Sequence, residues 1–85
     1  MTPEEHKRRL AWQCRRGLLE VDLVLNGYLE AHFLAESSAH QKLFEQLLES
    51  QDADLFEWFT ERSLPDDDTL AAYVRHILEL LGKPE

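Results

Sequence analysis

Apolar residues recur along this chain at spacings of three and four, and this periodicity constrains the fold more than any other feature of the sequence. Between Leu19 and Phe33, and again over residues 43–48 and 70–81, the large apolar residues fall on one face of a helix. No stretch alternates apolar and polar residues as a half-buried strand does. The pattern therefore predicts an all-α chain.

Capping residues predict where the first two helices begin. Thr2, Pro3 and Glu5 form a capping box with proline in the first turn, which starts a helix expected over residues 3–16. A second helix is expected over residues 18–34, weakened at Gly27. Its predicted core positions are Leu19, Leu23, Leu25 or Val24, Tyr28, Leu29 and Phe33.

Three further helices follow polar breaks. Ser37 or Ser38 is the expected cap of a third helix that ends by residue 50. Asp52 is the expected cap of a short fourth helix, and residues 66–68 start a fifth that Gly82 ends. A small five-helix bundle is the predicted architecture, with residues 1–85 as a single domain.

Charge is distributed unevenly between the start of the chain and the rest. The formal net charge is −8, but residues 1–17 carry +3 and residues 18–85 carry −11. The basic end could bind an anion or a carboxylate, whereas the acidic remainder would repel nucleic acid. We therefore expect no nucleic-acid partner.

The sequence also indicates a compartment. It has no apolar run of the roughly 18 to 20 residues that a membrane span needs, so no membrane insertion is expected. One cysteine cannot form an internal disulfide, and the first residues lack the apolar stretch of a secretory signal. These observations favour a cytoplasmic protein.

The residue types most often used for catalysis and metal binding have simpler explanations here. Cys14 lacks a second cysteine and an assigned base, so we expect it to be a buried apolar residue. The acidic residues 66–68 are explained by helix capping. The histidines lack the i, i+3 or i, i+4 spacing of a helical metal site, so no metal site is expected; they are His6, His32, His40 and His76.

Residues 14–22 concentrate charge around a glycine. Gly17 can adopt a positive φ and end a helix, which leaves Arg16 and Glu20 either as a solvated pair or at an exposed corner. A solvated pair would contribute roughly 0.5 kcal/mol or less. Trp12 is equally compatible with a core position and with an exposed interface anchor.

Arg16, Gly17 and Glu20 form an Arg-Gly-x-x-Glu motif, preceded by Trp12 and Cys14, followed by Asp22 and, farther along, by an Asp-x-Asp-Leu-x-x-Trp motif over residues 52–58. In these motifs the chain resembles the succinate dehydrogenase assembly factor family, over most of its length. One departure is Ala53, where relatives often have proline, and it affects helix capping only.

The resemblance implies a non-enzymatic chaperone that binds the flavoprotein subunit of succinate dehydrogenase, with that of fumarate reductase as a further client. It would promote covalent attachment of FAD to a histidine of that subunit. No cofactor is expected on the chain itself, because the FAD belongs to the partner. We expect the free protein to be a monomer.

The resemblance also assigns a partner-binding surface. Arg16 would offer a planar fork to a carboxylate or to carbonyl groups of the partner, Glu20 would accept hydrogen bonds, and Gly17 would let the two backbones approach closely. The remaining neighbours are Arg9, Trp12, Arg15 and Asp22.

Two rival functions stay open. The chain could be a free FAD-binding carrier, although a glycine-rich phosphate loop after a strand is missing. It could also be a small helical regulator such as a toxin-antitoxin component.

Overall fold

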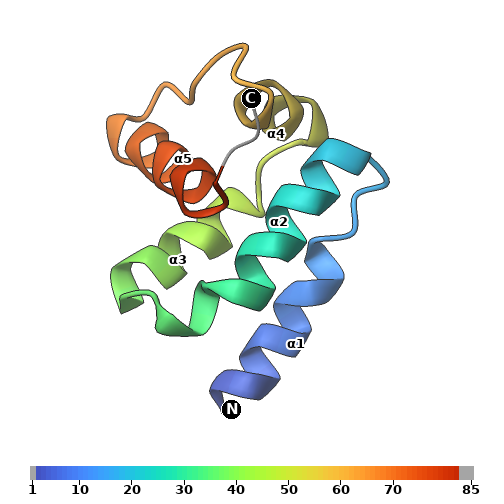
Figure 1. Cartoon of the computed structure of the whole chain (residues 1–85), viewed down its shortest axis with the longest axis vertical. Helices are drawn as coiled ribbons and strands as arrows, with labels where there is room; N and C mark the ends of the chain where they lie inside the picture. The colour runs from blue at the N-terminus through green and yellow to red at the C-terminus, as the bar shows by residue number, and fades with distance from the viewer. Residues whose placement is uncertain (1, 83–85) are drawn as a thin grey trace.

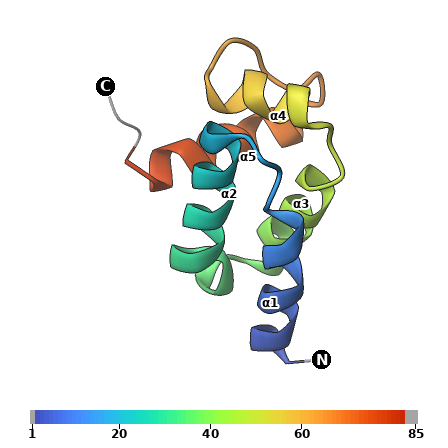
Figure 2. The ribbon, with the colours of Figure 1, turned by 90° about the vertical axis from the view of Figure 1, so that its right-hand side faces the viewer.

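The computed structural model describes residues 2–82, which form five α-helices and one 3₁₀-helix, without strands in that range. The elements are α1 (Pro3–Gln13), α2 (Leu19–Ala31), η1 (Phe33–Ala35), α3 (Ser38–Leu47), α4 (Asp52–Phe59) and α5 (Asp68–Leu80). Helix α2 lies between α1 and α5, and α4 lies near the start of α2 (Figure 1, Figure 2). The all-α prediction is confirmed.

Three of the predicted helix starts are confirmed. The Thr2 hydroxyl accepts from the Glu5 N–H at 3.1 Å, and the Glu5 carboxylate accepts from the Thr2 N–H at 2.9 Å. Ser37 caps α3 through the His40 N–H at 3.2 Å, and Asp67 caps α5 through the Leu70 N–H at 2.9 Å. These side chains satisfy N–H groups that the first helical turn leaves unpaired.

Other predicted boundaries need correction. Helix α1 ends at Gln13 rather than near Arg16, and the second helix gives way to η1 before residue 34. Gln51, not Asp52, is the N-cap residue of α4. The Asp52 carboxylate instead accepts a hydrogen bond from the Arg16 guanidinium, as described below.

The core draws on every helix. Most predicted core positions are buried, including Leu25, Tyr28, Phe44 and Ile77, and Cys14 is buried as expected. Leu19 and Leu23 are corrections, because they are 68% and 63% exposed. The buried face of α2 is set by Val21 and Leu25, and a two-residue step turns a helix by about 200°, which points Leu19 and Leu23 outward.

A short polar chain runs through this core. The Tyr73 hydroxyl donates to the Tyr28 hydroxyl at 2.9 Å, and Tyr28 donates to Glu36 Oε1 at 2.8 Å. Burial by itself would raise the pKa of Glu36, but hydrogen bonds from Tyr28 and His76 and the nearby His76 and His40 outweigh it and lower the pKa. The carboxylate is therefore ionised at neutral pH.

Within residues 2–82, every helix is too short or too polar to span a lipid bilayer.

Leu25→Ala should lower the free energy of unfolding by about 2–5 kcal/mol, because it removes a fully buried side chain and leaves a cavity. Leu23→Ala, two residues earlier on the same helix, is the matched control and should change it by less than about 0.5 kcal/mol. Urea unfolding followed by circular dichroism measures both. Equal losses for the two variants would contradict the assignment of the buried face.

Candidate functional site

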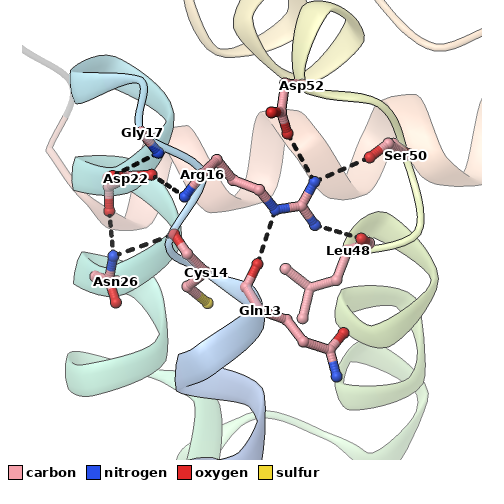
Figure 3. Close-up of polar contacts among 9 residues, drawn as sticks. All are labelled: Gln13, Cys14, Arg16, Gly17, Asp22, Asn26, Leu48, Ser50 and Asp52. Carbon is pink, nitrogen blue, oxygen red and sulfur yellow. Dashed lines mark hydrogen bonds and ion pairs between the residues drawn. The ribbon is translucent and has the colours of Figure 1, made fainter.

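The connection between α1 and α2 is held by the first two turns of α2. Asp22 accepts two backbone hydrogen bonds from this connection, from the Arg16 N–H at 2.8 Å and from the Gly17 N–H at 3.3 Å. Asn26 Nδ2 donates to the Asp22 carbonyl at 2.8 Å and to the Cys14 carbonyl at 3.4 Å (Figure 3). The path of residues 14–18 is therefore fixed by α2.

Gly17 supplies the turn in this connection. Its φ is +83°, a conformation that costs other residues about 1–2 kcal/mol. A Cβ built at Gly17 would have no atom within 4 Å. Glycine is therefore required by the positive φ of the backbone and not by close packing. The glycine lies beyond the end of α1, in the linker, and its outward side is exposed.

The Arg16 side chain turns inward and binds three helix ends. Its Nε donates to the Gln13 carbonyl at the end of α1 at 2.8 Å. Its Nη2 donates to the Leu48 carbonyl, at the end of α3, and its Nη1 donates to the Ser50 carbonyl at 3.1 Å. Nη1 also donates to Asp52 Oδ1 at 2.9 Å, in the first turn of α4 (Figure 3).

This placement suits the charges of the helix ends. Carbonyl groups at the ends of α1 and α3 lack helical partners, and a cation there is stabilised by the helix dipole. Asp52 brings a negative charge to the start of α4, where the dipole also favours it. With 15% of its side chain exposed, Arg16 is a structural connector between α1, α3 and α4.

The role expected for Arg16 changes accordingly. The carboxylate that pairs with Arg16 is that of Asp52, in the same chain, rather than that of Glu20. The alternative of a solvated Arg16–Glu20 pair is therefore wrong. The planar fork is occupied by the chain's own acceptors. Contact of Arg16 or Asp22 with a partner stays a prediction, and both residues act first as positioning residues.

Other predicted site residues lie on the outer surface around this junction. Trp12 is 72% exposed, and the Arg15 guanidinium carbon lies 5.4 Å from the centroid of its ring. Arg9, Trp12 and their neighbours Glu5 and Arg8 line a shallow hollow on α1. A core position for Trp12 is therefore wrong, and its role as an interface anchor stays a prediction.

Glu20 lies on the other side of the linker, exposed in the first turn of α2. It borders a largely apolar hollow between α2, α4 and α5, lined also by Leu23, Val24, Phe59, Glu61, Leu78 and Leu81. The exposed Leu19 belongs to the same turn of α2 as Glu20. The junction thus joins a basic, aromatic surface on α1 to an acidic and apolar surface on α2.

Cys14 faces the core beneath the linker. Burial raises the pKa of its thiol to about 12, against the opposing effect of the Arg16 charge. At neutral pH the thiol is protonated and inaccessible, which does not suit a nucleophile.

Several residues of the junction carried no recognisable signal in the sequence. Leu48 and Ser50 contribute backbone carbonyls, which any residue type could supply. The sequence marks Asp52 as a helix cap and as part of the Asp-x-Asp-Leu-x-x-Trp motif, but not as a partner of Arg16, and it does not single out Asn26. The spacing of Asp22 and Asn26, four apart on one helix face, could have indicated their shared role.

Arg16→Lys should lower the free energy of unfolding by about 2 kcal/mol, because lysine keeps the charge but cannot direct a planar fork at three helix ends. Arg15→Lys is the matched control, since Arg15 is exposed, and should change stability by less than about 0.5 kcal/mol. Urea unfolding measures both. An unchanged midpoint for Arg16→Lys would show that the bonds at the helix ends do not hold the fold together.

Known proteins match this chain over almost its whole length. The family described as the flavinator of succinate dehydrogenase, Sdh5, matches residues 8–81. Relatives named FAD assembly factor SdhE include those of Psychrobacter arcticus, 39% identical over 88% of this chain and 81% of the relative, and of Pseudomonas aeruginosa, 38% identical over 93% and 94%. That of Vibrio cholerae is 40% identical over 92% and 91%. This chain therefore belongs to the Sdh5 family of succinate dehydrogenase flavinators.

Proposed function

We propose that this protein binds the flavoprotein subunit of succinate dehydrogenase and promotes the covalent attachment of FAD to a histidine of that subunit. The observation that carries the proposal is the family match over residues 8–81, which includes the whole Arg-Gly-x-x-Glu motif. The FAD and the modified histidine both belong to the partner. The chain acts as an assembly factor on a cofactor that it does not keep.

The contact with the partner is proposed to centre on the α1–α2 junction. Arg9, Trp12 and Arg15 supply an aromatic and cationic surface, which suits carboxylates and apolar side chains of a partner. Gly17 leaves room for a second backbone, and Glu20 supplies an exposed acceptor. Arg16 and Asp22 hold this surface in shape from within.

The chain is proposed to work by positioning rather than by catalysis. Covalent attachment joins the flavin to a histidine, and that chemistry is supplied by the flavin itself. Binding that favours a productive arrangement of the immature flavoprotein increases the rate through proximity and population shift. The buried, protonated thiol of Cys14 is consistent with a factor that lends no nucleophile to the reaction.

The remaining expectations belong to the same proposal. We place the factor in the cytoplasm, where an immature flavoprotein subunit is made, and expect it to be a monomer when free. We keep the fumarate reductase flavoprotein as a second client, because it would present the same kind of flavin and histidine. Residues 1–85 are proposed to act as one domain.

The alternative of a FAD carrier is separated from this proposal by titration. An assembly factor should show no micromolar affinity for free FAD, while a carrier must bind it without a partner. Quenching of flavin fluorescence in the purified protein measures this. A small regulator such as a toxin-antitoxin component would be recognised by co-purification without the flavoprotein subunit.

Trp12→Ala should weaken binding to the flavoprotein subunit by about tenfold or more, because exposed aromatic residues at the centre of an interface often contribute 2 kcal/mol or more. Covalent flavin on the subunit should fall in parallel. In-gel flavin fluorescence of the flavoprotein, in cells whose only assembly factor is the variant, measures this directly.

The matched comparison for the cationic part of the surface is Arg15→Ala against Arg75→Ala. Both arginines are exposed, but Arg75 is on α5, which lies on the other side of α2 from α1 (Figure 1). Arg15→Ala should reduce flavinylation and Arg75→Ala should not. If Trp12→Ala and Arg15→Ala each leave flavinylation complete, the contact with the flavoprotein subunit lies elsewhere on the chain.

Gly17→Arg should nearly abolish flavinylation, because its side chain would fill the open space where the partner backbone approaches. Gly17→Ala is the control, since it carries the same positive-φ strain of about 1–2 kcal/mol but little bulk. It should stay helical by circular dichroism and keep most of its activity. Equal losses for the two variants at equal stability would rule out a steric role for this position.

A further inference from the structure

Three side chains that can bind metals meet away from the α1–α2 junction. Glu36 ends η1, His40 lies in the first turn of α3, and His76 lies on α5. His76 Nε2 is 2.7 Å from Glu36 Oε1, and His40 Nδ1 is 3.2 Å from the same oxygen. The centroids of the two imidazole rings are 4.5 Å apart, and the ligand atoms of all three residues lie within 4.8 Å of one another.

The three side chains are held in place by buried tyrosines. Tyr28 donates to Glu36 Oε1 at 2.8 Å and is itself held by the Tyr73 hydroxyl at 2.9 Å. The Tyr73 ring also lies against both imidazoles, with its centroid 5.3 Å from that of His40 and 6.3 Å from that of His76. Such outer contacts orient ligands in metal sites and raise their affinity.

The cluster is also accessible. All three side chains are partly exposed, and His40 and His76 line a hollow beside α5 together with Asp68, Thr69 and Tyr73. A cation can therefore reach the cluster from solvent without opening the core. The hollow leaves room for water, and Asp68 lies close enough to line the same space.

Two imidazoles and one carboxylate are a donor set that suits Zn²⁺ and similar divalent ions, with a fourth position left for water. Bond lengths near 2.0 Å in a tetrahedron place neighbouring ligand atoms about 3.3 Å apart. The His40 contact already has this spacing, and the His76 contact needs to lengthen by about half an ångström. The ligand nitrogens of His40 and His76, which lie within 4.8 Å of each other, must also come to this spacing, and the partly exposed side chains have room to rotate.

We propose that Glu36, His40 and His76 form a binding site for a divalent transition metal ion of the Zn²⁺ class, which would link η1, α3 and α5. Spacing along the sequence indicated no such site, because a test for neighbours on one helix cannot detect histidines 36 positions apart. The site is independent of the partner-binding role of the α1–α2 junction. A bound ion would stabilise the half of the bundle that carries the polar chain of tyrosines.

The direct test is calorimetric titration of the untagged full chain with ZnCl₂, after chelator treatment and in a buffer that does not bind zinc. We expect one ion per chain with a Kd in the micromolar range or tighter, and a higher melting temperature at saturation. Co²⁺ should give the visible absorption of a tetrahedral nitrogen and oxygen site. Binding only in the millimolar range would overturn the proposal.

Variants locate the site. His76→Gln and His40→Gln should each lower zinc affinity by at least about tenfold and remove the thermal stabilisation. His6→Gln is the matched control, because His6 Nε2 also contacts a carboxylate, Glu45 Oε2, at 2.9 Å but belongs to no three-ligand cluster within residues 2–82. It should bind zinc as the wild type does.

Two results with the variants would contradict the proposal. Wild-type zinc affinity in both His76→Gln and His40→Gln would place the ion elsewhere, and an equal loss in His6→Gln would indicate nonspecific binding. If circular dichroism shows that one of these two variants does not fold, the zinc affinity of the other variant decides the test. If both fail, the Co²⁺ spectrum of the wild type decides: tetrahedral bands at one ion per chain support a site of three protein ligands and one water, and the weak bands of octahedral hydrated Co²⁺ would overturn it.

Discussion

The four hydrogen bonds of the Arg16 guanidinium hold together the ends of three helices at the α1–α2 junction. They join the end of α1 to the end of α3 and the start of α4, which are 32 to 36 residues away in the chain. A planar cation with several donors can serve such a junction, because the C-terminal ends of α1 and α3 leave carbonyl groups without helical partners and Asp52 adds a carboxylate at the start of α4. The Asp22 carboxylate then fixes the backbone that carries Arg16, so the connector and its support lie within one short segment.

This arrangement divides the Arg-Gly-x-x-Glu motif into an inner and an outer part. Arg16 faces inward and is mostly covered, whereas Gly17 and Glu20 face solvent. A substitution at Arg16 would therefore impair the proposed partner-binding surface even if the guanidinium never touched the partner, since the geometry of the corner depends on it. Loss of activity alone cannot distinguish contact from support at this position, and stability must be measured beside it.

Local signals in the sequence predicted local structure well. Thr2, Ser37 and Asp67 cap helices as their positions indicated, because a cap is decided by residues only three apart. The partners of Arg16 could not be predicted, since backbone carbonyls leave no mark in a sequence and the contacts depend on how the helices pack. The approach of His40 and His76 was missed for the same reason. The motif located the candidate site, whereas the hydrogen bonds within it became visible only in the folded structure.

The errors in the predicted core are informative because they cluster beside the motif. Leu19 and Leu23 continue the apolar pattern of α2, yet both side chains face solvent, near Glu20 and an apolar hollow. Trp12 is exposed on the neighbouring helix α1. Burying a large apolar side chain stabilises a fold by roughly 1.5–3 kcal/mol. This small protein leaves three such side chains exposed and lacks that stabilisation. Sequences tend to depart from their folding pattern where they bind something else. Burial of these residues against a partner would recover that free energy, which is a physical reason for the motif and the misplaced leucines to lie together.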